Sequence, residues 1–347
     1  MDFFDVLNLI GGLCLFLFGM NTMSDGLEKL AGGKLEAILK KMTSNPVKSL
    51  VLGAGITAVI QSSSAVTVML VGLVNSGLMT MSQTLYVIYG ANIGTTVTAW
   101  ITNLAFMEGG GNFFLWLFDT DTLAPIALAI GIILIMFIKS KKSKTIGDIS
   151  MGFGILFIGL MNMTGAVKGF ADSPAFMEIL ASFSDTPILG ILAGLVLTVI
   201  VQSSSATVGM LQTVAQASNG AVTFAMAYPV IMGINLGTCV TTAMVCSIGS
   251  SKDAKRTGVV HIVFNVIGTI VFMGVMYVLQ NFNVWGEAFW FMNADSGVIA
   301  NFQTIFNLVT AIALIPFAGL LVKLSLAIVK PEKIVKKKNA NQNHYQK

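Results

Sequence analysis

The chain has 347 residues, of which 55% are hydrophobic and only 10% are charged, and its mean hydropathy is +0.82. A soluble globular protein carries about 25% charged residues, so this composition excludes a water-exposed surface over most of the chain. The net charge of +4 does not indicate a nucleic-acid partner, because the lysines lie in short clusters between apolar segments. The composition predicts an all-α polytopic membrane protein.

Apolar segments follow one another along the chain, separated by short polar connections. The predicted segments span residues 3–23, 46–75, 78–106, 123–138, 149–167, 187–217, 221–248, 258–280 and 297–329. The first is expected to be retained as a helix, because acidic residues precede it where a signal peptide would be basic.

The basic residues assign a side of the membrane to each connection. All but two of the 20 Lys and Arg residues lie in 24–49, 139–148, 249–257 and 330–347, whereas 107–122 and 281–296 contain none. The positive-inside rule places the basic group in the cytoplasm. This assignment predicts that the N-terminus is outside and the C-terminus inside, in a cytoplasmic membrane.

That topology requires segments 46–75 and 187–217 to enter and leave the membrane on the same side. Thirty helical residues span about 45 Å, which is too short to cross a hydrocarbon core of about 30 Å twice. Each segment is therefore predicted to be a re-entrant helical hairpin.

The chain repeats itself after about 141 residues. Pro46–Ala65 aligns without gaps to Pro187–Ala206, and both end in Gln-Ser-Ser-Ser-Ala. The flanking motifs recur in the same order. Upstream, Gly12–Gly19 matches Gly152–Gly159, and downstream, Gly90-x-Asn92-x-Gly94-Thr95 matches Gly233-x-Asn235-x-Gly237-Thr238. An odd number of crossings separates the copies, so the second is predicted to be inverted, as in secondary transporters. The predicted division is 1–148, 149–329 and a lysine-rich cytoplasmic tail, 330–347.

Two kinds of polar motif lie at membrane depth. The Gln-Ser-Ser-Ser blocks are predicted to form the hairpin tips, with the serines capping the second arm. Such a helix N-terminus attracts anions. The Gly-x-Asn-x-Gly-Thr motifs are predicted to break a transmembrane helix, whose free carbonyls can coordinate a small cation. The alternative for both is packing between helices.

An intramembrane hydrolase with His261 as base is a weaker hypothesis. The sequence has no Gly-x-Ser-x-Gly elbow and no carboxylate at the same depth, so His261 is expected to be structural and the protein not to be an enzyme. The stretch His261–Asn265 has an echo in Gln303–Asn307, for which helix packing and support of a transport site both remain open.

The paired blocks, each followed by Gly-x-Asn-x-Gly-Thr, resemble the sodium/phosphate cotransporters, a bacterial family with animal type II relatives. The resemblance covers roughly residues 9–320 and implies sodium-driven transport of inorganic phosphate. It places phosphate on the hairpin serines, namely Ser62, Ser63, Ser64, Ser203, Ser204 and Ser205. It places sodium on neutral side-chain oxygens, namely Gln61, Thr67, Asn92, Thr95, Gln202, Thr207, Asn235 and Thr238.

No cofactor is expected besides the coupling sodium ions, and a homodimer remains open. Moving a phosphate dianion inward against 100 mV costs about 4.6 kcal/mol, and each sodium returns about 2.3 kcal/mol. At least two sodium ions per phosphate are therefore expected. The alternatives are a sodium-coupled transporter of another oxyanion or a dicarboxylate, and a channel or membrane scaffold that transports nothing actively.

Overall fold

The computed structural model describes residues 3–31, 38–39, 45–107, 119–171, 173–247 and 251–330. This part of the chain is helical and contains no β-strand, apart from an isolated bridge between Thr223 and Asn293. The predicted tail beyond residue 330 lies outside the described residues. The prediction of an all-α chain is confirmed.

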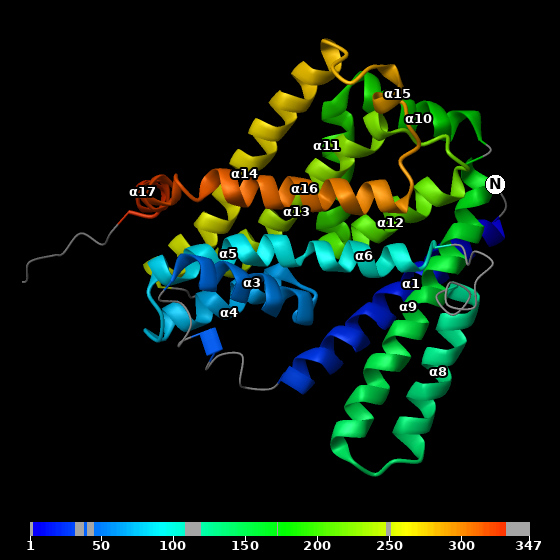
Figure 1. Cartoon of the computed structure of the whole chain (residues 1–347), viewed down its shortest axis with the longest axis horizontal. Coiled ribbons are helices and arrows are strands. Elements are labelled where there is room, and N and C mark those ends of the chain that lie inside the picture. Colours follow the sequence, from blue (N-terminus) through cyan, green and yellow to red (C-terminus); the bar gives the residue numbers. More distant parts are fainter. Residues whose placement is uncertain are drawn as a thin grey trace, which may run out of the picture.

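The helices are arranged as shown in Figure 1. In chain order they are α1 (Phe3–Ala31), α3 (Pro46–Ile60), α4 (Ser63–Asn75), α5 (Met81–Gly94), α6 (Thr96–Leu104), α8 (Thr120–Met136), α9 (Lys141–Ala171), α10 (Pro174–Asp185), α11 (Pro187–Val201), α12 (Ser204–Ala217), α13 (Phe224–Ser247), α14 (Lys252–Asn281), α15 (Glu287–Trp290), α16 (Ser296–Leu314) and α17 (Ala318–Ile328).

Among these, α1, α9, α13, α14 and α16 are long and apolar enough to span a membrane. Helices α10 and α11 pass the same criterion together, but they meet at an angle of 113°. The remaining apolar helices, including both arms of the first hairpin, are shorter than a span. The described helices are those of a polytopic membrane protein.

The observed helices depart from one predicted segment and from one predicted connection. The last segment is divided into α16 and α17 near Pro316, and α10 occupies part of a connection for which no helix was predicted. Pro174 begins α10 at a position where proline is favoured, because its missing N–H would have no partner there.

The predicted helix break is wrong in the second half of the chain. Helix α13 continues through Asn235 and Thr238, whose side chains donate to carbonyls of their own helix, Ile231 O at 2.8 Å and Asn235 O at 2.5 Å. In the first half, α5 and α6 are divided at Thr95, but the backbone there stays right-handed helical, with φ −59° and ψ −27°.

The motif glycines serve close packing instead of helix breaks. A Cβ at Gly90 would collide with the carbonyl of Leu50, and one at Gly233 with that of Ile191. These contacts are equivalent in the repeat and join α5 to α3 and α13 to α11. We call α5 and α13, which carry the Gly-x-Asn-x-Gly-Thr motifs, the motif helices. The first arm of each hairpin therefore packs on its motif helix in the same way in both halves.

The antiparallel helices α1 and α9 approach each other through glycine at two levels. Gly12 lies against Gly159, and Gly19 lies against Gly152, so closely that a Cβ on any of the four would come within 3.0 Å of the partner backbone. The repeat aligns Gly12 with Gly152 and Gly19 with Gly159. Gly12 therefore contacts the counterpart of Gly19, and Gly19 contacts the counterpart of Gly12. This is the contact pattern of two elements related by a two-fold axis.

Candidate functional site

Each hairpin turns at a glutamine in the left-handed conformation. Gln61 ends α3 with φ 61°, and Gln202 ends α11 with φ 58°. The next residues are the N-caps of the second arms. Ser62 accepts from Ala65 N at 3.1 Å, and Ser203 accepts from its counterpart, Ala206 N, at 3.2 Å. The predicted serine caps are thus confirmed, and each first arm ends at the predicted glutamine. A left-handed residue other than glycine costs about 1 kcal/mol, and the structure carries this cost twice at matching positions.

The serines that follow the caps differ in their hydrogen bonding. Ser64 lies 3.2 Å from Thr241, hydroxyl to hydroxyl, which joins the first hairpin to α13 in the other half. Ser63, Ser204 and Ser205 are buried as residues, and their hydroxyls make no hydrogen bond within the described part of the chain. At the two tips, free backbone N–H groups and uncommitted hydroxyls therefore lie together, which is what an oxyanion requires.

The two tip glutamines lie in different surroundings. Gln61 is buried, and its Oε1 accepts a hydrogen bond of 2.8 Å from Thr98 on α6. Gln202 is exposed. The two glutamines still share one bond, because each amide nitrogen donates to a carbonyl one turn back, Ala58 O for Gln61 and Val199 O for Gln202. The first tip is held by neighbouring helices, and the second is open.

Of the four threonines expected to bind sodium, the two that follow the serine blocks are not counterparts. Thr67 donates to Ser63 O and Thr207 to Ser203 O, both at 2.9 Å, but Thr207 aligns with Val66 in the repeat. Thr95 likewise donates to its own helix, at Ala91 O. Each of these hydroxyls can still accept from a donor or coordinate a cation, because a hydroxyl has two lone pairs.

The motif asparagines are buried and are contacted by the two echo segments. Asn92 Oδ1 accepts from Asn265 Nδ2 on α14 at 3.3 Å, and Asn235 Oδ1 accepts from Gln303 Nε2 on α16 at 3.3 Å. His261 extends the first of these pairs, with Nδ1 3.0 Å from Thr242 Oγ1 and Nε2 3.4 Å from Asn265 Nδ2. The echo segments therefore support the motif helices directly.

The sequence analysis missed two threonines that form hydrogen bonds with the first tip, Thr98 with Gln61 and Thr241 with Ser64. A signal for them exists, because both motifs continue as Gly-Thr-x-Val-Thr and these two residues are counterparts. It also missed Gln212, a fully buried residue of α12 that donates to Ala99 O and Ser296 O, both at 3.0 Å. Gln212 has no equivalent in the first half, so the repeat gives no signal for it.

The ligands available at the tips are neutral. Within the described residues, no group of three or more His, Cys, Asp or Glu side chains could hold a metal ion. Arg256 at the start of α14 bonds Asp253 at 2.5 Å and Val329 O at 3.0 Å, so its charge is committed elsewhere. Any anion at the tips must be stabilised by backbone N–H groups, hydroxyls and accompanying cations.

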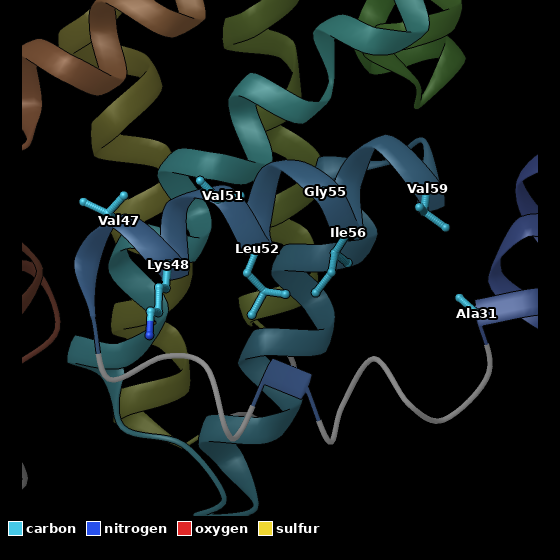
Figure 2. A pocket seen from close by; sticks show the side chains of 8 residues that line it. All are labelled: Ala31, Val47, Lys48, Val51, Leu52, Gly55, Ile56 and Val59. Atoms are coloured by element: carbon cyan, nitrogen blue, oxygen red, sulfur yellow. The ribbon is translucent and has the colours of Figure 1, made fainter.

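An apolar groove of about 460 Å³ runs along α3. Figure 2 shows its lining, which comes almost entirely from α3 and consists of Ala31, Val47, Lys48, Val51, Leu52, Gly55, Ile56 and Val59. None of the residues from Gln61 to Ser64 contributes to it. An apolar groove of this kind does not suit phosphate or sodium.

A family model described as Na+/Pi-cotransporter matches residues 15–165 and again residues 162–293. The chain belongs to the Na+/Pi-cotransporter family. Each copy of the Gln-Ser-Ser-Ser block lies in a different one of the two matches. The resemblance predicted from the motifs is confirmed, and membership makes this cotransporter-family chain a membrane transporter.

Two of the relatives described next carry names that refer to phosphate. The chain is 28% identical to the uncharacterized protein YqeW of Bacillus subtilis, over 90% of the chain and 94% of the relative. It is 25% identical to YjbB of Salmonella typhimurium, named provisionally as an inorganic phosphate export protein, over 94% of the chain but only 56% of the relative. A stretch of 105 residues, 29% of the chain, is 40% identical to the sodium-dependent phosphate transport protein 2A of Rattus norvegicus, of which it covers 16%. No solved structure gave a significant match.

Proposed function

We propose that this protein is a secondary active transporter that carries inorganic phosphate together with sodium by alternating access. The observation that carries this proposal is the pair of hairpin tips. In both halves the turn has the same backbone conformation, and Ser63 and Ser204 offer uncommitted hydroxyls beside free N–H groups of a helix N-terminus. The names of the relatives support phosphate as the substrate.

Sodium supplies the positive charge that the described tip residues lack. Two helix N-termini provide about one positive charge in total, which is less than a phosphate dianion requires. The proposed sodium ligands are the neutral oxygens of Gln61, Asn92, Gln202 and Asn235, with the hydroxyls of Thr67, Thr95, Thr207 and Thr238. With no basic side chain at the tips, at least two sodium ions would accompany each phosphate.

The two halves are proposed to be inverted repeats with re-entrant hairpins. Two observations support this arrangement. The glycine contacts between α1 and α9 are exchanged as a two-fold axis requires. The basic residues also gather in alternate connections, since 139–148 and 249–257 contain seven Lys and Arg residues while 107–122 and 281–296 contain none.

Cysteine labelling in intact cells tests the orientation. A cysteine at Asn283, in the exposed turn after α14, should react with an impermeant reagent from outside, and one at Ser143, near the start of α9, should not. Asn112, in the connection that precedes α8, is also expected to label from outside, but it lies outside the described residues. External labelling at Ser143 would contradict both the orientation and the inverted repeat.

Uptake into proteoliposomes tests the function itself. Purified protein should accumulate labelled phosphate when an inward sodium gradient is imposed, and accumulation should stop when the gradient is dissipated. Unlabelled phosphate should compete, whereas sulfate and succinate should not. Competition by sulfate or succinate would change the substrate, and the absence of any saturable accumulation would favour a channel or a scaffold.

A further inference from the structure

Within the described residues, a small set of buried side-chain oxygens has no hydrogen-bond partner. They are Thr57 Oγ1, Thr223 Oγ1, Asn265 Oδ1, Thr269 Oγ1 and Asn307 Oδ1. Buried polar atoms are nearly always paired, so an unpaired one requires an explanation. Three of the five lie on α14 and α16, the helices that contact the motif asparagines.

The two asparagines hold matching positions in the echo segments. Asn265 donates to His261 O at 3.0 Å, and Asn307 donates to Gln303 O at 2.9 Å, each bonding one turn back on its own helix. Each amide nitrogen is therefore committed, and each Oδ1 is left without a donor while the side chain is at most 1% exposed.

The orientation of the Asn265 amide follows from its neighbours. Its nitrogen faces acceptors, namely Asn92 Oδ1 at 3.3 Å and His261 O at 3.0 Å, with His261 Nε2 3.4 Å away. Turning the amide over would bring two carbonyl oxygens together, so the unpaired atom is the oxygen. The same reasoning applies to Asn307, whose nitrogen faces the Gln303 carbonyl.

Two further oxygens accompany the Asn265 side chain, one on α14 and one on α5. Thr269 lies one helical turn further along α14, on the same face as Asn265, and its unpaired hydroxyl is also buried. Asn92 Oδ1 lies against the same amide. On α16, Asn307 follows Gln303, which bonds Asn235. A group of neutral oxygens that lacks donors suits a hard monovalent cation, because carbonyl and hydroxyl oxygens are the ligands such ions take.

We propose that Asn265 Oδ1 with Thr269 Oγ1, and Asn307 Oδ1 at the matching place on α16, are ligands of two sodium sites, one beside α5 and one beside α13. The identity of the ion rests on the proposed sodium coupling. An ion held there fixes α14 against α5 and α16 against α13, and so sets the position of the Asn92 and Asn235 amides.

The decisive variant is Thr269→Val, which keeps the shape of the side chain and removes only the hydroxyl. The readout is thermal stabilisation of the purified full chain by sodium chloride, titrated against choline chloride at constant ionic strength and without phosphate. The sodium concentration at half-maximal stabilisation should rise at least fivefold in Thr269→Val and in Asn307→Leu. Without sodium, Thr269→Val should be as stable as the unmodified chain, because it removes an unpaired buried group.

Thr223→Val is the matched control, because it also removes an unpaired buried threonine hydroxyl but lies at the start of α13, away from the echo segments. Its sodium midpoint should not change. A normal midpoint in both Thr269→Val and Asn307→Leu would overturn the sites, as would an unmodified chain that sodium does not stabilise. Phosphate uptake that ignores sodium, combined with a shifted midpoint in these variants, would instead reject the proposed coupling and keep the sites.

Discussion

Replacing sodium by choline at constant ionic strength is expected to weaken phosphate binding to the purified protein by roughly 5- to 150-fold, the usual range of coupling between two ligands. The reason is electrostatic. The described hairpin tips present hydroxyls and N–H groups but no cationic side chain, and Arg256 is committed to Asp253. Calorimetric titration of phosphate at several sodium concentrations measures the effect, and titration of sodium at several phosphate concentrations must give the same factor, because binding linkage is reciprocal.

Variants of the amide ligands refine this experiment. Gln61→Ala and Asn235→Ala should lose much of the sodium dependence, because each removes a proposed carbonyl ligand. Gln83→Ala is the control, since this glutamine caps the start of α5 by accepting from Thr80 N at 2.8 Å and lies outside the site. Phosphate affinity that is indifferent to sodium in the unmodified protein would mean that protons or a basic residue neutralise the anion.

Removing the hydroxyl of Ser63 or Ser204 is expected to reduce phosphate uptake about tenfold or more. A hydrogen bond to a charged group is worth about 1.5–3 kcal/mol, and both hydroxyls are free of other partners in the described part of the chain. Ser63→Ala and Ser204→Ala should therefore insert and express normally while transport falls. The initial rate of labelled-phosphate uptake into proteoliposomes measures the loss.

Variants of other serines in the same hairpins distinguish a loss of phosphate binding from a loss of stability. Ser62→Ala and Ser203→Ala remove N-caps, which should lower thermal stability by about 1 kcal/mol. Ser76 bonds Leu73 O at the far end of α4, so Ser76→Ala should transport normally. Normal transport in both Ser63→Ala and Ser204→Ala would reduce these serines to helix-packing residues.

Local features of the site could be predicted from the sequence, because they depend on residues close together in the chain. A polar Gln-Ser-Ser-Ser block in an apolar run has few conformations that satisfy its backbone, so the turns at Gln61 and Gln202 and the caps at Ser62 and Ser203 follow from it. The same holds for the all-helical fold, which lipid imposes on a chain this apolar.

Features that depend on distant contacts could not be predicted. The motif glycines were interpreted as helix breaks, but Gly233 lies in a continuous helix because α11 packs against it. The bond between Ser64 and Thr241 joins residues 177 positions apart. The different surroundings of Gln61 and Gln202 depend on how the helices around each tip are placed in this one conformation, and two identical motifs carry no information about that difference.

The backbone contact between α1 and α9 has a mechanical consequence for transport. Where glycines meet at two levels, sliding one helix along the other would drive larger side chains, such as Phe16 and Leu156, into gaps that accommodate only a hydrogen atom. The pair is therefore expected to stay fixed, as a stationary axis, while an access cycle proceeds around it. Movement in the proposed cycle is left to the hairpins and motif helices. Their contacts across the two halves combine apolar packing, such as Tyr89 against Phe264, with hydrogen bonds that can exchange partners, such as the one between Ser64 and Thr241. In this arrangement the repeat supplies both the part that does not move and the parts that do.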